Sequence, residues 1–163
     1  MTLIIHKPSV FALLGLLLFV PPCFGQITGD KDFVASHSLR VRENLNAQID
    51  MFVALNKKRK WEELYKILYE PLGKEKFIKQ RKQSMFYADA FDSRKAVTPD
   101  PNSKGWVMVF GCVTVSYGDG SVERLKGFMH AYLENDLWLL TDIEFLRKGV
   151  HSPPDKCEER EAE

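Results

Sequence analysis

Two strand-like segments near the C-terminus carry the side chains that could perform acid–base chemistry. His130 and Asp142 are the residue types of a general base and its orienting carboxylate, and Asp142 alternates with Glu144. Paired carboxylates support acid–base catalysis where burial separates their pKa values. However, a register built on two-residue turns points His130 and Asp142 to opposite faces of the sheet. We therefore expect no dyad and no catalytic residue, and we place Asp142 and Glu144 at the rim.

Aromatic side chains with polar tips accompany these residues. Tyr65 and Tyr69 are four positions apart and share one face of a predicted helix, so their rings could pack while their hydroxyls reach the rim. The residues that we expect to line a ligand pocket are Tyr65, Tyr69, Phe110, His130, Tyr132, Trp138 and Asp142.

The motifs of cofactor and metal chemistry do not occur in the sequence. It has no Gly-rich phosphate loop, no nucleophile elbow and no zinc-binding pair of cysteines. The segment Gly118-Asp119-Gly120 is predicted to be a hairpin turn instead of a phosphate cradle. We expect neither a cofactor nor a metal ion.

The elements that must position these side chains are strands of an antiparallel sheet. Residues 105–117, 122–134 and 137–146 are rich in β-branched and aromatic residues, and residues 85–97 form an earlier strand that is interrupted near residues 92–95. If Asp119-Gly120 and Asn135-Asp136 are two-residue turns, both faces of the sheet are apolar. One face would carry Trp106, Met108, Phe110, Cys112, Leu125, Met129, Leu133, Trp138 and Leu140. The other would carry Val107, Val109, Val113, Val115, Phe128, His130, Tyr132, Leu139, Ile143 and Phe145.

Helices precede these strands. Val41, Leu45, Ile49 and Phe52 form one apolar stripe, which predicts a helix from Ser36 or Ser38 to residue 56. Two shorter helices are predicted over residues 62–69 and 74–83. Because an antiparallel sheet usually exposes one face to water, two apolar faces imply that the helices cover one and a partner subunit covers the other.

This order of elements resembles the nuclear transport factor 2-like family over residues 34–146. The matching segments are Trp61-Glu62-Glu63-Leu64-Tyr65 through Tyr69-Glu70-Pro71-Leu72, and Tyr132-Leu133-Glu134-Asn135-Asp136-Leu137-Trp138-Leu139-Leu140. The resemblance implies an α+β cone, in which N-terminal helices pack on a curved four-stranded antiparallel sheet. It also implies a homodimer through the outer face of the sheet. Members include isomerases, dehydratases and pure binding modules, so the family leaves the activity open.

The N-terminus has the layout of a secretory signal peptide. Lys7 precedes an apolar run over residues 10–20, and Pro21-Pro22 and Gly25 follow it. That run is shorter than the roughly 20 residues that cross a bilayer. We expect cleavage after Gly25 and a secreted or periplasmic product without a stable membrane span. The alternatives are an uncleaved signal anchor and a lipoprotein modified at Cys23.

The expected mature chain is one domain, residues 26–146, followed by a mobile charged tail, residues 147–163. Its formal net charge is close to zero, which gives it no global reason to bind nucleic acid. Residues 57–82 carry ten basic and four acidic side chains, as in a solvated helix face or a surface for an acidic partner or anionic lipid. Cys112 and Cys157 could form a disulfide, but the strand position of one and the tail position of the other favour a buried thiol at Cys112.

Together these features predict an exported, non-catalytic binding or accessory domain. It would hold a small apolar ligand in the cone, or a protein partner on the sheet. The alternative is a small isomerase or dehydratase that uses a carboxylate or histidine in the pocket. The two functions require different residues inside the cone. An enzyme needs an ionisable group buried in the pocket, whereas a binding module needs a mainly apolar lining.

Overall fold

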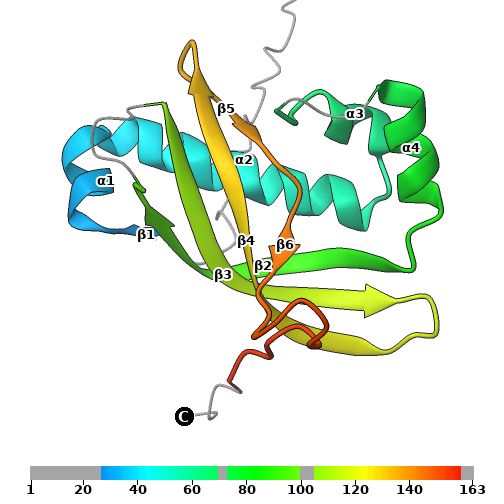
Figure 1. Cartoon of the computed structure of the whole chain (residues 1–163). Helices are drawn as coiled ribbons and strands as arrows, with labels where there is room; N and C mark the ends of the chain where they lie inside the picture. The colour runs from blue at the N-terminus through cyan, green and yellow to red at the C-terminus, as the bar shows by residue number, and fades with distance from the viewer. Residues whose placement is uncertain (1–26, 70–72, 100–104, 159–163) are drawn as a thin grey trace, which may run out of the picture.

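The protein has an α+β fold in which helices precede a curved, open sheet (Figure 1). The computed structural model describes residues 27–69, 73–99 and 105–158, so the predicted signal peptide lies outside it. The first elements are β1 (Thr28–Gly29), α1 (Lys31–Ser36), α2 (Leu39–Lys57), α3 (Trp61–Tyr65) and α4 (Lys74–Lys82). The remaining strands are β2 (Phe86–Val97), β3 (Trp106–Tyr117), β4 (Val122–Glu134), β5 (Leu137–Leu140) and β6 (Glu144–Phe145).

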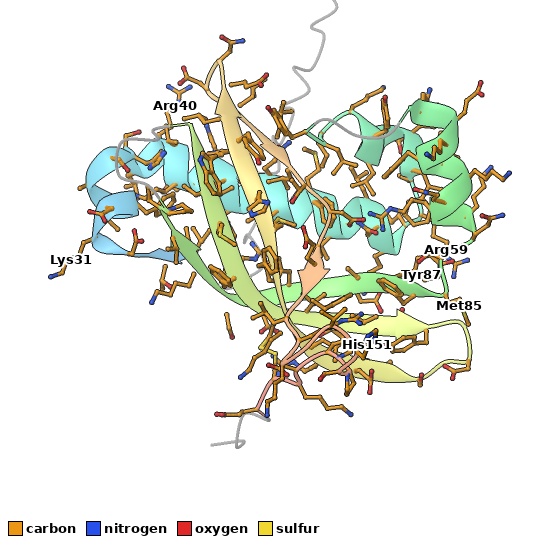
Figure 2. The ribbon with its side chains drawn as sticks, viewed as in Figure 1. Lys31, Arg40, Arg59, Met85, Tyr87 and His151 are labelled. Atoms are coloured by element: carbon orange, nitrogen blue, oxygen red, sulfur yellow. A yellow bond between two sulfur atoms is a disulfide. The ribbon has the colours of Figure 1, made fainter. Side chains whose placement is uncertain are left out.

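Helix α2 is the main helical cover of the sheet, and it lies behind the strands in Figure 1. It begins where the Ser38 side chain accepts a hydrogen bond from the Val41 backbone amide, which satisfies one of the free N–H groups at a helix start. Three residues of the predicted stripe, Leu45, Ile49 and Phe52, are completely buried, which confirms that stripe. Lys31 and Arg59 lie toward opposite ends of the molecule (Figure 2).

The second predicted helix is shorter than expected, because α3 ends at Tyr65 instead of near residue 69. Beyond it the chain runs beside β5. The Leu140 amide donates to the Ile67 carbonyl at 3.0 Å, and the Tyr69 amide donates to the Leu140 carbonyl at 2.8 Å. These backbone bonds with a distant strand replace the helical bonds, and the helical spacing of the side chains does not reveal them.

Within the described residues, the sheet has six strands in place of the predicted four. Its order is β1-β2-β3-β4-β5, with β6 also paired to β4, and β1 pairs with β2 in parallel whereas the other pairs are antiparallel. The last predicted strand is divided between β5 and β6. At the break, the Thr141 hydroxyl accepts from the His130 amide, and the Asp142 carboxylate accepts from the Ile143 amide. These side chains take the place of ladder partners.

The register of β3 and β4 differs from the predicted register by one residue. Their turn contains three residues, Gly118-Asp119-Gly120, and Gly120 adopts a φ of 86° that side chains disfavour. As a result Val109 lies opposite Met129. The turn between β4 and β5 does contain two residues as predicted, and Asn135 and Asp136 both have positive φ.

This one-residue shift corrects the predicted faces, because it moves every side chain of one strand to the other face. The inner face, toward α2, combines residues that the sequence had separated, namely Val107, Val109, Val113, Val115, Leu125, Met129, Trp138 and Leu140. The outer face carries Trp106, Met108, Phe110, Cys112, Phe128, His130, Tyr132 and Leu139. Apolar residues therefore lie on both faces, but the half of the outer face near the β3–β4 hairpin also carries Thr114, Ser116, Arg124 and Lys126.

Strand β2 is irregular where the sequence indicated an interruption. The register shifts between Asp92 and Lys95, and Ser93 has a φ of 53°. Such bulges bend a strand and redirect side chains. Here the bulge directs Arg94 toward α2, where its guanidinium donates to the Asp50 carboxylate at 2.5 Å.

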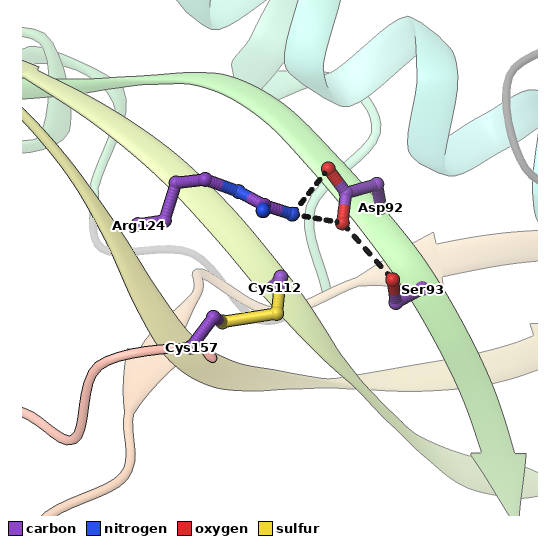
Figure 3. Close-up of a disulfide and its surroundings, with 5 residues drawn as sticks. All are labelled: Asp92, Ser93, Cys112, Arg124 and Cys157. Carbon is purple, nitrogen blue, oxygen red and sulfur yellow. Dashed lines mark hydrogen bonds and ion pairs between the residues drawn. A yellow bond between two sulfur atoms is a disulfide. The ribbon is translucent and has the colours of Figure 1, made fainter. Parts of the chain in front are cut away.

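The prediction of a free, buried thiol at Cys112 is wrong, because Cys112 and Cys157 form a disulfide (Figure 3). The Cys112 side chain is on the outer face, where the tail can reach it. Backbone groups of β4 hold that tail, since the Cys157 amide donates to the Arg124 carbonyl at 3.0 Å and the Lys126 amide donates to the Asp155 carbonyl at 2.7 Å. These contacts use main-chain atoms and leave no pattern in the sequence. Residues 159–163 lie outside the described part of the chain.

Candidate functional site

The structure distributes the seven predicted pocket residues over four places. Trp138 lies in the core, where its indole N–H donates to the Val41 carbonyl at 2.9 Å. Tyr65 packs beside Phe77 of α4, with ring centroids 5.7 Å apart. Phe110, His130 and Tyr132 lie on the outer face of the sheet. The last two, Tyr69 and Asp142, line a cleft at the end of the sheet near α4.

The outer face carries a continuous cluster of rings. The register places Trp106 opposite Tyr132, Met108 opposite His130, and Phe110 opposite Phe128. Neighbouring ring centroids lie 5.5 Å apart for Trp106 and His130, and 5.8 Å apart for Phe110 and Phe128. We call this group the outer aromatic face; its members are Trp106, Met108, Phe110, Phe128, His130 and Tyr132.

Tyr69 connects this face to the cleft. Its ring stacks on that of Tyr132 with centroids 3.9 Å apart, and its backbone amide is fixed to the Leu140 carbonyl. Stacking of this kind stabilises by about 0.5–1.5 kcal/mol beyond the buried area. The segment after α3 thus completes one edge of the outer aromatic face.

His130 is a packing residue in this arrangement. Its ring makes edge contacts with the rings of Trp106, Phe128 and Tyr132. Asp142 instead forms an ion pair with Arg81 of α4. The structure records no contact between the His130 and Asp142 side chains in the described residues, so the two do not form a dyad.

The cleft lies between α4, the segment after α3, and β6, and it has a volume of about 470 Å³. Its apolar wall consists of Leu68, Tyr69, Phe77 and Phe86. Its polar groups are Gln80, Arg81, Ser84, Thr141, Asp142 and Glu144. The Asp142 side chain is 56% exposed whereas that of Arg81 is 13% exposed, so the ion pair lies at the mouth of the cleft. A cleft of this size could accept a small amphipathic molecule.

The space between α2 and the sheet is packed with side chains. Leu45, Ile49 and Phe52 of α2 are completely buried there, and so are Val109 and Met129 of the sheet. The ligand cavity that we expected inside the cone would need the space that these buried side chains fill. The cleft therefore lies at the margin of the core and not in its centre.

Ionisable groups with shifted pKa values occur at the β3–β4 hairpin. Burial raises the pKa of the Tyr117 hydroxyl, and the hydrogen bond that it donates to Glu123 raises it further. The hydrogen bond from Lys156 lowers the pKa of the Glu123 carboxyl, with a second contribution from Tyr117. These groups tie the C-terminal segment to the hairpin.

Cluster geometry suited to a metal ion is absent from the described residues, which contain no group of three or more His, Cys, Asp or Glu side chains that could hold one. In the same part of the chain, no helix combines the length and apolar character needed to cross a bilayer. No protein-family model, curated protein or solved structure matches the chain.

Sequence reasoning did not select three residues that matter at these sites. Trp106 and Phe128 were assigned to opposite faces because the β3–β4 turn was taken to have two residues. The signal for a three-residue turn was the glycine at each end of Gly118-Asp119-Gly120. Arg81 was counted among the basic residues of a helix, and its ion pair with Asp142 depends on tertiary packing.

Proposed function

We propose that this protein is an exported, non-catalytic binding domain that pairs with a second copy of itself through the outer aromatic face. The supporting observation is the face itself. Its six side chains are apolar or aromatic, and α2 packs on the opposite side of the sheet. An antiparallel sheet with one covered face normally exposes polar residues on the other.

A second copy is the occupant that fits this face best. A two-fold dimer brings the same patch of each subunit into contact, so an apolar patch meets an apolar patch. None of the six side chains is a carboxylate, a lysine or an arginine. The formal net charge of the chain is +1, so electrostatic repulsion between copies is small.

Export is part of the proposal, and the disulfide supports it. Structural disulfides persist in oxidising compartments such as the periplasm or the extracellular space. The Cys112–Cys157 bridge closes a 45-residue separation and joins the tail to the sheet. This agrees with the secretory signal expected in residues 1–25.

The proposal retains the likeness to nuclear transport factor 2-like proteins that the sequence suggests. What supports it is the sequence of helices followed by a curved, open sheet. A cone of that type would place the homodimer contact on the outer side of the sheet, where the aromatic residues lie.

The geometry favours binding over the isomerase or dehydratase alternative. His130 lies on the outer face, and Asp142 is mostly exposed and ion-paired with Arg81. An acid–base catalyst works best when its pKa is tuned close to the operating pH by burial or neighbours. A small ligand in the cleft remains compatible with the proposed binding function.

The oligomeric state tests this proposal. The 18.8 kDa chain should scatter light as a dimer at micromolar concentration, and Trp106→Glu should convert it to a monomer because a carboxylate would be buried in the contact. The control is Leu39→Glu, since Leu39 is 62% exposed at the start of α2, on the opposite side of the sheet from the aromatic face. A monomeric wild-type protein, or a Leu39→Glu variant that dissociates equally, would refute the dimer.

A further inference from the structure

Charge is distributed unevenly along this chain. Residues 57–82 carry ten basic and four acidic side chains, whereas the net charge of the whole chain is only +1. The rest of the chain is therefore net acidic. A nearly neutral protein with such an asymmetry has a strong local field at one place on its surface.

The fold gathers the basic residues at one end of the molecule. This end contains the C-terminus of α2, followed by α3 and α4 (Figure 1). Glu62 and Glu63 are ion-paired with Lys74 and Lys60. Six further lysines are exposed and form no ion pair within the described residues; we call them the basic end, and they are Lys57, Lys58, Lys66, Lys76, Lys79 and Lys82.

Both arginines of this region are engaged within the protein. The Arg59 guanidinium lies 4.4 Å from the centre of the Tyr87 ring, and Arg81 pairs with Asp142. Most of the charges presented outward are therefore lysine ammonium groups on flexible stems. Lysine acts as a point charge, whereas arginine gives the planar, bidentate recognition of a shaped anionic ligand.

An exposed apolar side chain stands beside these charges. Met85 lies three residues after the end of α4 and is 80% exposed, and the next residue, Phe86, is 38% exposed. Figure 2 places Met85 at the same end of the molecule as Arg59. A combination of lysines and an exposed apolar side chain at one end of a molecule suits contact with a lipid headgroup layer.

We propose that the basic end docks on an anionic lipid surface, with its lysines at the headgroups and Met85 at the level of the first acyl carbons. Diffuse lysine charges match a continuous layer of negative charge better than they match the discrete carboxylates of a folded acidic protein. The contact uses none of the six side chains of the outer aromatic face, so it goes beyond the proposed self-association.

Co-sedimentation with lipid vesicles tests this surface. Full-chain protein should bind vesicles of phosphatidylcholine mixed with phosphatidylglycerol, and bind vesicles of phosphatidylcholine alone much less. Binding should weaken as salt rises above roughly 0.1 M, where the screening length is about 10 Å. All variants share one N-terminus, so differences among them report the basic end.

The double variant Lys79→Glu/Lys82→Glu should lower the vesicle partition coefficient by at least ~10-fold, since two attractive charges become repulsive. Met85→Ser should lower it less, with little change in salt dependence. The matched control is Lys31→Glu/Arg40→Glu, which reverses two exposed charges away from this end (Figure 2).

Two results would overturn the proposal. One is a wild-type protein that does not bind phosphatidylglycerol vesicles at low salt; the basic end would then suit an acidic protein or only solvent. The other is an equal loss of binding in the Lys31→Glu/Arg40→Glu control, which would show that net charge alone drives the association. Because all four reversed positions are exposed, the variants should unfold at the wild-type temperature.

Discussion

Arg94 shows how one side chain can join two layers of the fold. It is 3% exposed, and the β2 bulge directs it toward α2. Its guanidinium donates to the Asn46 side chain at 2.7 Å and to Asp50 at 2.5 Å, while its Nε donates to the Phe91 carbonyl at 2.6 Å. A buried charge requires such partners, because desolvation otherwise outweighs the contacts that it makes.

We predict that Arg94→Ala lowers the free energy of unfolding by about 2–4 kcal/mol. Loss of one partner of a buried pair costs roughly 3–5 kcal/mol, and we reduce that range because water reaches part of Asp50 and screens its charge. Urea denaturation followed by circular dichroism measures the change. Arg40→Ala, at an exposed position of α2, is the control and should shift stability very little. An unchanged midpoint for Arg94→Ala would show that the network adds no net stability.

At the residue scale, the sequence predicted the core of α2 better than the sites on the sheet. Leu45, Ile49 and Phe52 follow from helical spacing alone, since each lies three or four positions from the next. The faces of His130 and Tyr132 depend instead on the length of the turn that precedes their own strand, β4. One extra residue in that turn moved them relative to Trp106, and no local feature of either strand reports it.

Among the elements, the C-terminal segment shows the largest difference between the sequence-based prediction and the structure. It was expected to be a mobile charged tail. Its described residues instead bond to the edge of β4, pair Lys156 with Glu123 at 3.0 Å, and join β3 through Cys112. The two-residue strand β1 was missed because a strand this short shows no alternation.

We predict that reduction of the disulfide lowers the free energy of unfolding by roughly 4 kcal/mol on the chain-entropy model for a loop of this length. The bridge joins residues 45 positions apart and so restricts the unfolded chain strongly. Thermal unfolding with and without reductant measures the shift. The Cys112→Ser/Cys157→Ser variant should match the reduced wild type and be insensitive to reductant. A wild-type melting temperature that reductant does not change would contradict a structural role for the bridge.

At the scale of the whole molecule, three parts of the protein differ in what covers them or in the side chains that they expose. The inner face of the sheet is occupied by α2, the outer face presents aromatic rings, and the basic end presents lysines. The sequence predicted the α+β class and the presence of apolar residues on both faces of the sheet, because strand periodicity and turn residues are local signals. Which face met the helices could not be predicted, because it depended on the β3–β4 turn.

Charge asymmetry gives a prediction that depends on no particular lipid. At a pH above the sequence pI of about 7.7, the chain carries a net negative charge. If that charge were spread evenly over the surface, a cation exchanger would not retain the protein. We expect retention at low ionic strength nonetheless, because the lysines of the basic end contact the resin as a local patch. Lys79→Glu/Lys82→Glu should elute at lower salt than Lys31→Glu/Arg40→Glu, although both variants have the same net charge. Equal elution of the two variants would mean that the basic residues do not act as one surface.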